Sequence, residues 1–189
     1  MIAIIDYGAG NIFSVKNALD YLGVENKLTA DKNEICAADE IILPGVGAFP
    51  WAMKMLRDSG LVDTIREEAR KKPFLGICLG MQLIFDKGYE FEETDGLRLI
   101  GGKVEKIDRK NMIIPHMGWN ELEINRDCPI LKGLPEHPYV YFVHSYAAVC
   151  DEANVSAYCD YGGKITALVH DGAYVYGAQF HPEFKSRPN

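Results

Sequence analysis

Three short apolar runs, separated by segments with helical periodicity, most strongly constrain the fold of this 189-residue chain. They cover Ile2–Ile5, Glu40–Leu43 and Phe74–Ile77, and such runs are typical of parallel strands buried on both faces. Helical patterns lie between and after them, at Asn11–Leu22, Trp51–Leu56, Leu61–Lys71 and Met81–Lys87. We therefore predict an α/β fold, with a mostly parallel central sheet and helices on both faces.

The second half of the chain has a β-rich pattern. Turn signals at Gly101-Gly102, Gly162-Gly163 and Asp171-Gly172 alternate with runs of strand-forming residues. These runs are Arg98–Ile107, Tyr139–Val149, Ala157–Tyr161, Ile165–His170 and Ala173–Phe180. We expect hairpins or a mixed extension of the same sheet, within a single domain that spans residues 1–189.

Charge and hydropathy argue against several classes of partner. The formal net charge is −7 and no cluster of Lys or Arg is present, which disfavours nucleic acids and anionic membranes as ligands. No apolar run approaches the ~18 residues that a membrane-spanning helix needs, and the first residues lack the basic segment of a signal peptide. We expect a cytoplasmic protein.

The sequence gives no sign of a disulfide framework, a metal site or a cofactor site. The cysteine count is odd, at five, and no pair has C-x-x-C spacing. The loop at Asp6–Asn11 resembles a dinucleotide-binding turn only in part, because Phe13 stands where the third glycine of G-x-G-x-x-G would be. We therefore predict neither cofactor nor metal.

The segment Gly76-Ile77-Cys78-Leu79-Gly80 falls where a buried strand should become a helix. A nucleophile on such a sharp turn is exposed above the sheet edge, and the tight turn requires small neighbours, as in the G-x-S-x-G elbow. The following backbone N–H, that of Leu79, would point at an oxyanion, and the Gly45–Gly47 loop could complete the hole. The alternative is a buried cysteine whose flanking glycines serve only packing.

A thiol nucleophile needs a base, and the base needs an acceptor that orients it. His181 follows an apolar run and is separated from Glu183 by one proline. In an extended segment, residues i and i+2 share a face, so Glu183 would reach His181. The alternative is a histidine with only a structural role.

Taken together, G-I-C-L-G-M-Q at 76–82 and Q-F-H-P-E at 179–183 resemble the class I glutamine amidotransferase family. Four further segments are D-Y-G-A-G-N at 6–11, L-P-G-V-G-A-F at 43–49, P-H-M-G-W-N at 115–120 and Y-F-V-H-S-Y at 141–146. Together they are similar to the branch of this family that supplies the glutaminase subunit of imidazole glycerol phosphate synthase. The resemblance implies a flavodoxin-like α/β sandwich. It also implies hydrolysis of L-glutamine to glutamate and ammonia through a cysteine thioester.

The resemblance also implies roles for single residues. Cys78 would be the nucleophile, His181 the general base and acid, and Glu183 its orienting partner. Oxyanion N–H groups would come from Gly47 and Leu79, and substrate contacts from Gln82, His144, Ser145 and Tyr146. Five residues would face a partner subunit and the mouth of an ammonia path, namely Asn11, Pro115, His116, Gly118 and Trp119.

The implied partner is a (β/α)8-barrel cyclase in a 1:1 heterodimer, acting in histidine biosynthesis. The chain itself has no P-loop, so the reaction that accepts ammonia should lie on another chain. Three alternatives stay open. They are a glutaminase serving CTP, GMP or anthranilate synthesis, a cysteine hydrolase of the same fold, and an α/β binding module without activity.

The chain departs from this branch near its end. Members usually have Lys directly after the triad glutamate, where it helps contact the cyclase, whereas this chain has Phe184 and then Lys185. The segment H-P-E-F-K-S-R-P-N at 181–189 is more similar to the end of the glutaminase domain of CTP synthase. We also expect a final helix on the sheet in this family, and the given sequence ends at Asn189.

Overall fold

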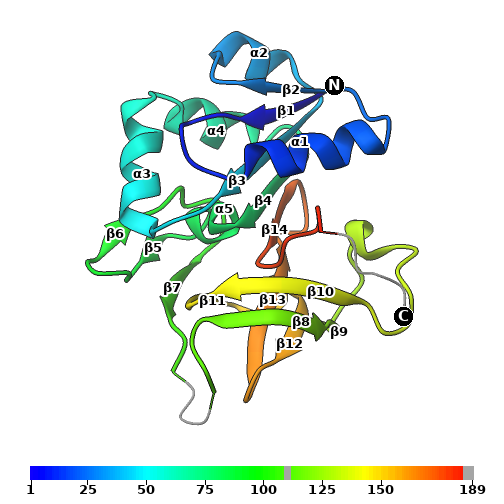
Figure 1. Ribbon diagram of the computed structural model, residues 1–189. Helices are drawn as coiled ribbons and strands as arrows, with labels where there is room; N and C mark the ends of the chain where they lie inside the picture. Colours follow the sequence, from blue (N-terminus) through cyan, green and yellow to red (C-terminus); the bar gives the residue numbers. More distant parts are fainter. Residues whose placement is uncertain (109–111, 185–189) are drawn as a thin grey trace.

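The central element is a mixed sheet of eight strands (Figure 1). The computed structural model describes residues 1–108 and 112–184. Five neighbouring strands are parallel and the last three run antiparallel to their neighbours. In spatial order the strands are β2 (Asn26–Thr29), β1 (Ile2–Ile5), β3 (Glu40–Gly45), β4 (Phe74–Cys78), β14 (Val175–Ala178), β13 (Lys164–His170), β12 (Val155–Asp160) and β9 (Glu123–Ile124).

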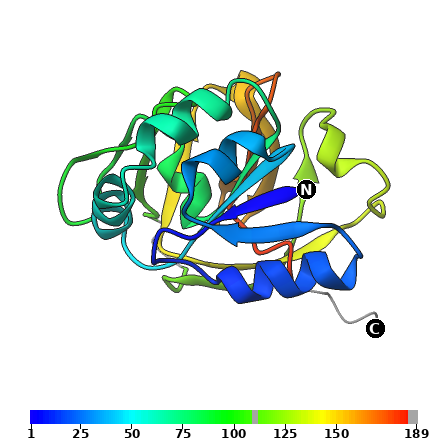
Figure 2. The same cartoon turned by 90° about the horizontal axis from the view of Figure 1, so that it is seen from above.

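Helices cover both faces of the parallel half of the sheet (Figure 2). On one face, Val15 of α1 (Ile12–Tyr21) packs with Ile4 and Ile42. On the other, a larger cluster contains Ile41 and buried side chains from the remaining helices. These are α2 (Lys32–Ala37), α3 (Phe49–Asp58), α4 (Val62–Glu68) and α5 (Leu79–Leu83). Successive strand residues thus point to opposite cores, which explains their continuous apolar runs.

The second half adds two smaller sheets and two 3₁₀ turns. Strands β10 (Tyr139–His144) and β8 (His116–Glu121) form an antiparallel pair. A four-stranded sheet has the order β11 (Tyr146–Cys150), β7 (Gly102–Lys106), β5 (Lys87–Gly88) and β6 (Thr94–Asp95). The 3₁₀ turns are η1 (Pro129–Leu131) and η2 (Glu152–Asn154).

The structure confirms the fold class and corrects several elements. The three predicted parallel strands and the antiparallel extension are present. The helix predicted at Met81–Lys87 is wrong, because α5 begins at Leu79 and ends at Leu83, and Lys87 begins β5. The run predicted at Tyr139–Val149 divides at Ser145 into strands of different sheets. No helix of the described residues is long and apolar enough to cross a membrane.

The register of the parallel strands gathers the site at one sheet edge. Gly45 at the end of β3 pairs with Cys78 at the end of β4, and Ala178 at the end of β14 pairs with Ile77. The loops that leave β3, β4 and β14 therefore emerge side by side. This is the edge at which α/β proteins bind ligands.

Candidate active site

Cys78 occupies the sharp turn between β4 and α5. Its backbone has φ 55° and ψ −112°, a conformation that costs a non-glycine residue roughly 1–3 kcal/mol. Strand β4 ends at Cys78 and the helix begins at Leu79, as the elbow predicts. The turn therefore presents Cys78 at the sheet edge, where its side chain lines a cavity.

Three glycines make this turn possible because their backbones touch. A Cβ on Gly80 would lie 1.9 Å from the carbonyl oxygen of Leu43, and one on Gly76 would lie 2.5 Å from the carbonyl oxygen of Gly80. A Cβ on Gly45 would lie 2.6 Å from the backbone nitrogen of Gly80. The small residues are required by direct contact between the elbow and β3.

His181 and Glu183 form a buried hydrogen-bonded pair, with 2.8 Å between Nδ1 and Oε1. The contact was predicted, but the extended segment that was expected to make it is wrong. Strand β14 ends at Ala178, and His181–Phe184 forms a turn in which the N–H of Phe184 donates to the His181 carbonyl at 3.2 Å. The N–H of His181 donates to the Tyr141 carbonyl at 3.0 Å, which fixes the turn to β10.

The electrostatics of His181 favour its charged form. Burial lowers the pKa of His181, but hydrogen bonding and charge from Cys78 and Glu183 outweigh burial and raise it to about 10. Nδ1 is held by Glu183, which leaves Nε2 as the ring nitrogen available to Cys78. His181 is therefore oriented by Glu183 and poised to exchange a proton with Cys78.

Cys78 and His181 line the same cavity, of about 390 Å³. The structure places there nine residues singled out in the sequence, which are Gly47, Cys78, Leu79, Gln82, Pro115, His144, Ser145, Tyr146 and His181. Val46, Glu90 and Val143 also line it and were not predicted. A cavity of this size suits a small ligand such as an amino acid.

Gln82 and Gln179 are joined in the buried wall next to Cys78. The Gln82 Nε2 donates to the Tyr146 carbonyl at 2.9 Å and to Gln179 Oε1 at 3.0 Å. The Gln179 Nε2 approaches the Cys78 Sγ at 4.0 Å, a weak contact. Gln179 was part of the recognised motif, but its sequence position alone did not indicate that its side chain points at the sulfur.

Glu90 brings a carboxylate to the cavity from the segment after β5. Its Oε2 accepts a hydrogen bond from the Phe49 N–H at 2.8 Å, and so caps α3, whose own N-cap residue, Ala48, has no side-chain oxygen. The pKa of Tyr146 is raised, chiefly by burial of Tyr146 and to a smaller extent by the negative charge of Glu90. No sequence motif marks Glu90, because its partners are distant in the chain.

The five residues expected at a partner interface have different positions. Pro115 is exposed at the cavity, Trp119 is 42% exposed on β8, and Gly118 and Asn11 are half-buried. His116 is 0% exposed, so the expectation that it faces a partner subunit is wrong. Its ring is stacked between those of Phe142 and Tyr161 inside the protein.

Phe184, where the related branch has Lys, packs on aromatic neighbours. Its ring meets Tyr141 edge-on at 5.5 Å between centroids and lies 5.3 Å from the His181 ring. Tyr141 in turn meets Trp119 at 5.6 Å. Phe184 thus links the triad turn to β8 without a charge. Lys185 lies outside the described residues.

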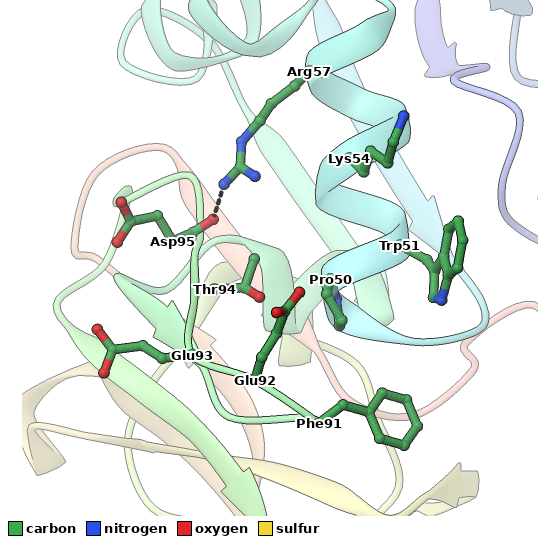
Figure 3. Close-up of a pocket in the computed structure, with 9 residues that line it drawn as sticks. All are labelled: Pro50, Trp51, Lys54, Arg57, Phe91, Glu92, Glu93, Thr94 and Asp95. Atoms are coloured by element: carbon green, nitrogen blue, oxygen red, sulfur yellow. Dashed lines mark hydrogen bonds between the residues drawn. The ribbon is translucent and has the colours of Figure 1, made fainter.

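A larger hollow, of about 840 Å³, lies beside α3 and does not include the triad (Figure 3). Arg57 reaches across it from α3 and donates to the Asp95 carbonyl at 2.6 Å. Trp51 and Phe91 project at its rim. Within residues 1–108 and 112–184, no group of three or more His, Cys, Asp or Glu is arranged to hold a metal ion.

Replacing Glu183 with Gln is expected to lower the pKa of His181, because the amide keeps the shape but removes the charge. Cys78 and Glu183 together raise the pKa of His181 from 6.5 to about 10, so the stability that they give to the charged ring is present below about 6.5 and lost as pH rises to about 10. The difference in unfolding free energy between wild type and Glu183→Gln should shrink over that range. Chemical denaturation at several pH values checks this, and a constant difference would contradict it.

Comparison with known proteins identifies the chain's relatives. The family model for glutamine amidotransferase class-I matches residues 3–189. "Imidazole glycerol phosphate synthase subunit HisH" of Bacillus cereus (strain G9842) is 50% identical over 184 residues, covering 97% of this chain and 87% of that protein. The protein of the same name from Listeria monocytogenes serotype 4a (strain HCC23) is 49% identical over 185 residues, covering 97% and 88%.

Solved structures share the fold at lower identity. A crystal structure of a glutamine amidotransferase has a TM-score of 0.75 at 23% identity and covers 97% of this chain and 91% of its own. The structure of PurLQS from Thermotoga maritima has a TM-score of 0.73 at 23% identity, with coverage of 96% and 87%. The family model and the close relatives together lead to one conclusion: the chain belongs to the class-I glutamine amidotransferase family.

Proposed function

We propose that this chain hydrolyses L-glutamine to glutamate and ammonia at Cys78 and passes the ammonia to a cyclase partner that makes imidazole glycerol phosphate in histidine biosynthesis. The observation that carries the chemistry is one cavity lined both by Cys78, on its strained turn, and by His181, which is hydrogen-bonded to Glu183. The pathway is supported by two relatives at about 50% identity that are named as subunits of that synthase.

The first half of the reaction forms a thioester. The Cys78 thiolate attacks the side-chain amide carbon of glutamine, and the carbonyl oxygen takes the negative charge. The N–H of Leu79, first in α5 and so without an intrahelical acceptor, would stabilise this oxyanion with that of Gly47. The C–N bond then breaks as His181 gives its Nε2 proton to the departing nitrogen, which releases ammonia.

The second half hydrolyses the thioester. His181, now neutral, takes a proton from water, whose oxygen attacks the thioester carbon. The C–S bond breaks, glutamate leaves, and the Cys78 thiolate is restored beside a protonated His181. Glu183 keeps Nδ1 protonated in both halves, so that Nε2 is the atom that gains and loses the proton.

Glu90 and Gln82 are suited to hold the amino-acid end of glutamine. Glu90 is the carboxylate among the described residues that line the cavity, and an α-ammonium group needs an anionic acceptor. Gln82 Nε2 is already engaged with Tyr146 and Gln179, so its Oε1 is the atom left for the substrate. The backbone at His144–Tyr146 also lines the cavity and would contact the carboxylate.

Changing Glu90 to Gln is expected to raise KM for L-glutamine roughly tenfold and to change kcat much less, because a charge that binds ground and transition states alike is lost. The amide can still accept from Phe49, so α3 should remain capped. Steady-state glutamate release measures both constants. Glu92→Gln, in the hollow beside α3, is the matched control. An unchanged KM in Glu90→Gln would remove Glu90 from the substrate site.

We further propose a (β/α)8-barrel cyclase as the partner, in a 1:1 heterodimer in the cytoplasm. Ammonia released freely would waste glutamine, so the acceptor reaction should be coupled to this cavity. The neighbouring strand β8 exposes Met117 at 60% and Trp119 at 42%, with Pro115 exposed beside the cavity. Such apolar side chains at a cavity mouth are typical of an interface.

The test is glutamate release by the chain alone, then with an imidazole glycerol phosphate synthase cyclase subunit and its nucleotide ligand. We expect a large rise with the cyclase and none with Cys78→Ala. Turnover that the cyclase does not change would support glutaminase activity but contradict the assignment to histidine biosynthesis. Co-purification with a CTP, GMP or anthranilate synthetase would then identify the acceptor reaction. Turnover of peptides but not glutamine would favour a cysteine hydrolase.

A further inference from the structure

A chain of buried polar side chains leads from the wall of the glutamine cavity to strand β8. Its links are His144 Nδ1 to the Tyr146 carbonyl at 2.8 Å, His144 Nε2 to His116 Nδ1 at 3.0 Å, and His116 Nε2 to the Asn120 side chain at 2.9 Å. Both histidines are buried, whereas Asn120 is half-buried. Neither His116 nor Asn120 lines the cavity, and the mechanism above uses neither.

The direction of this chain is fixed at the Tyr146 carbonyl. A carbonyl oxygen only accepts, so the His144 Nδ1 must carry the proton and donate. Burial lowers the pKa of His144 to about 4 despite the bond to Tyr146. His144 is therefore neutral near pH 7, and its Nε2 is an acceptor.

The same logic determines the state of His116. Because His144 Nε2 accepts, His116 Nδ1 must donate to it. Burial lowers the pKa of His116, although the bond to Asn120 opposes this, so the ring is neutral and its Nε2 is bare. The far end of the chain therefore needs a donor at Asn120.

The side-chain amide of Asn120 ends 2.9 Å from His116 Nε2, and an Oδ1 at this position would set two acceptors against each other. Turning the amide by 180° about its last bond keeps the shape and brings the Nδ2 group to the bare ring nitrogen. Every link then has one donor and one acceptor, from the Asn120 amide through His116 and His144 to the Tyr146 carbonyl. A buried network that is fully satisfied in this way holds its members rigidly.

We propose that His116 and Asn120 are positioning residues for the glutamine cavity, acting through His144 on the Tyr146 carbonyl. This rests on the proposed function, because the same carbonyl also accepts from Gln82 Nε2, and that bond directs Gln82 Oε1 to the substrate. In β8, residues 116, 118 and 120 share one face, and Met117 and Trp119 occupy the other. Strand β8 thus carries the exposed side chains beside the cavity. It also carries His116 and Asn120, whose hydrogen bonds hold the substrate contact of Gln82 in place.

Two variants of His116 separate hydrogen bonding from packing. Leu and Gln both remove the ring stacked on Phe142 and Tyr161, but only Gln can donate to His144 and accept from Asn120. In the Cys78→Ala background, where turnover does not interfere, calorimetry should show L-glutamine binding roughly tenfold weaker for His116→Leu, and His116→Gln should restore most of it. Equal affinities in the two variants would overturn the proposal.

Nitrogen-15 NMR of histidine-labelled protein tests the chain without substrate, and so separates its failure from failure of the proposed function. We expect protonated Nδ1 and bare Nε2 on both His116 and His144. In Asn120→Asp, a half-buried and isosteric change, the carboxylate cannot donate, so His116 should become protonated on both nitrogens while His144 keeps its state. A bare Nδ1 on either ring in wild type, or no change of His116 in Asn120→Asp, would overturn the chain.

Discussion

Cys78→Ala is expected to lower kcat/KM for glutamine hydrolysis at least 10⁴-fold, because no other group can form the thioester. The remaining His181–Glu183 pair can still activate water, but the attack on an unactivated amide would lack the covalent step. The variant should fold, since alanine removes a single buried sulfur and reduces the size of a side chain held at φ 55°. Glutamate release and the unfolding free energy measure the two effects separately.

Cys36→Ala is the matched control for this prediction. Cys36 is exposed on α2, away from the cavity lining, and its substitution should leave kcat/KM unchanged. The same rate in Cys78→Ala and wild type would assign the chemistry to another residue. A comparable loss in Cys36→Ala would point to a general effect of removing thiols.

Gly80→Ala is expected to destabilise the fold by roughly 3 kcal/mol, the upper part of the range for overpacking, and to remove most activity. Its Cβ would lie 1.9 Å from the Leu43 carbonyl oxygen, which is backbone and has no rotamer to change. Relief requires that β3 and the elbow separate, and this would displace Cys78 and the Gly47 loop. Chemical denaturation gives the loss of stability, and thiol alkylation reports the position of Cys78.

Gly101→Ala serves as the control, because its Cβ would meet only Asp86 Oδ2 at 3.9 Å, an ordinary contact. Its stability should stay within about 1 kcal/mol of wild type. If Gly80→Ala were as stable as Gly101→Ala, the close contact between β3 and the elbow would not determine the fold at this point.

The parallel half of the fold could be predicted because its strands are buried on both faces and so appear as continuous apolar runs. Strand β2 and helix α2 were missed for the opposite reason. Lys27 and Glu34 form an ion pair on the surface, and the Asp31 carboxylate accepts N-cap bonds from the N–H groups of Asn33 and Glu34, so this segment is largely polar. Its position is determined by pairing with β1 rather than by its own pattern.

The helix after Cys78 was predicted too far along the chain because its apolar side chains continue beyond the helix. Leu83, Ile84 and Phe85 are all buried, yet α5 ends at Leu83. The carbonyls of Leu83 and Phe85 instead accept bonds from Leu97 and Arg98. Apolar periodicity alone cannot distinguish a helix from a buried loop of this kind.

The elbow and the His181–Glu183 contact were visible in the sequence because each lies within a few residues. The roles of Glu90, Gln179 and Asn120 were not, since each depends on contacts with distant segments: Glu90 with Phe49, Gln179 with Cys78, and Asn120 with His116 and so His144. His116 was expected at a partner interface because the family resemblance implied that role for residues of the P-H-M-G-W-N segment. Strand alternation turns its ring inward instead.

Selective labelling of Cys78 tests the central claim most directly. A diazoketone analogue of glutamine should take a proton from His181 on its diazo carbon, form a C–S bond there with the Cys78 thiolate and lose dinitrogen. Mass spectrometry of peptides locates the adduct. The account predicts modification of Cys78 well before the exposed Cys36, and protection by excess L-glutamine. Equal labelling of Cys36 and Cys78, or no protection by glutamine, would contradict an active thiol in a glutamine site.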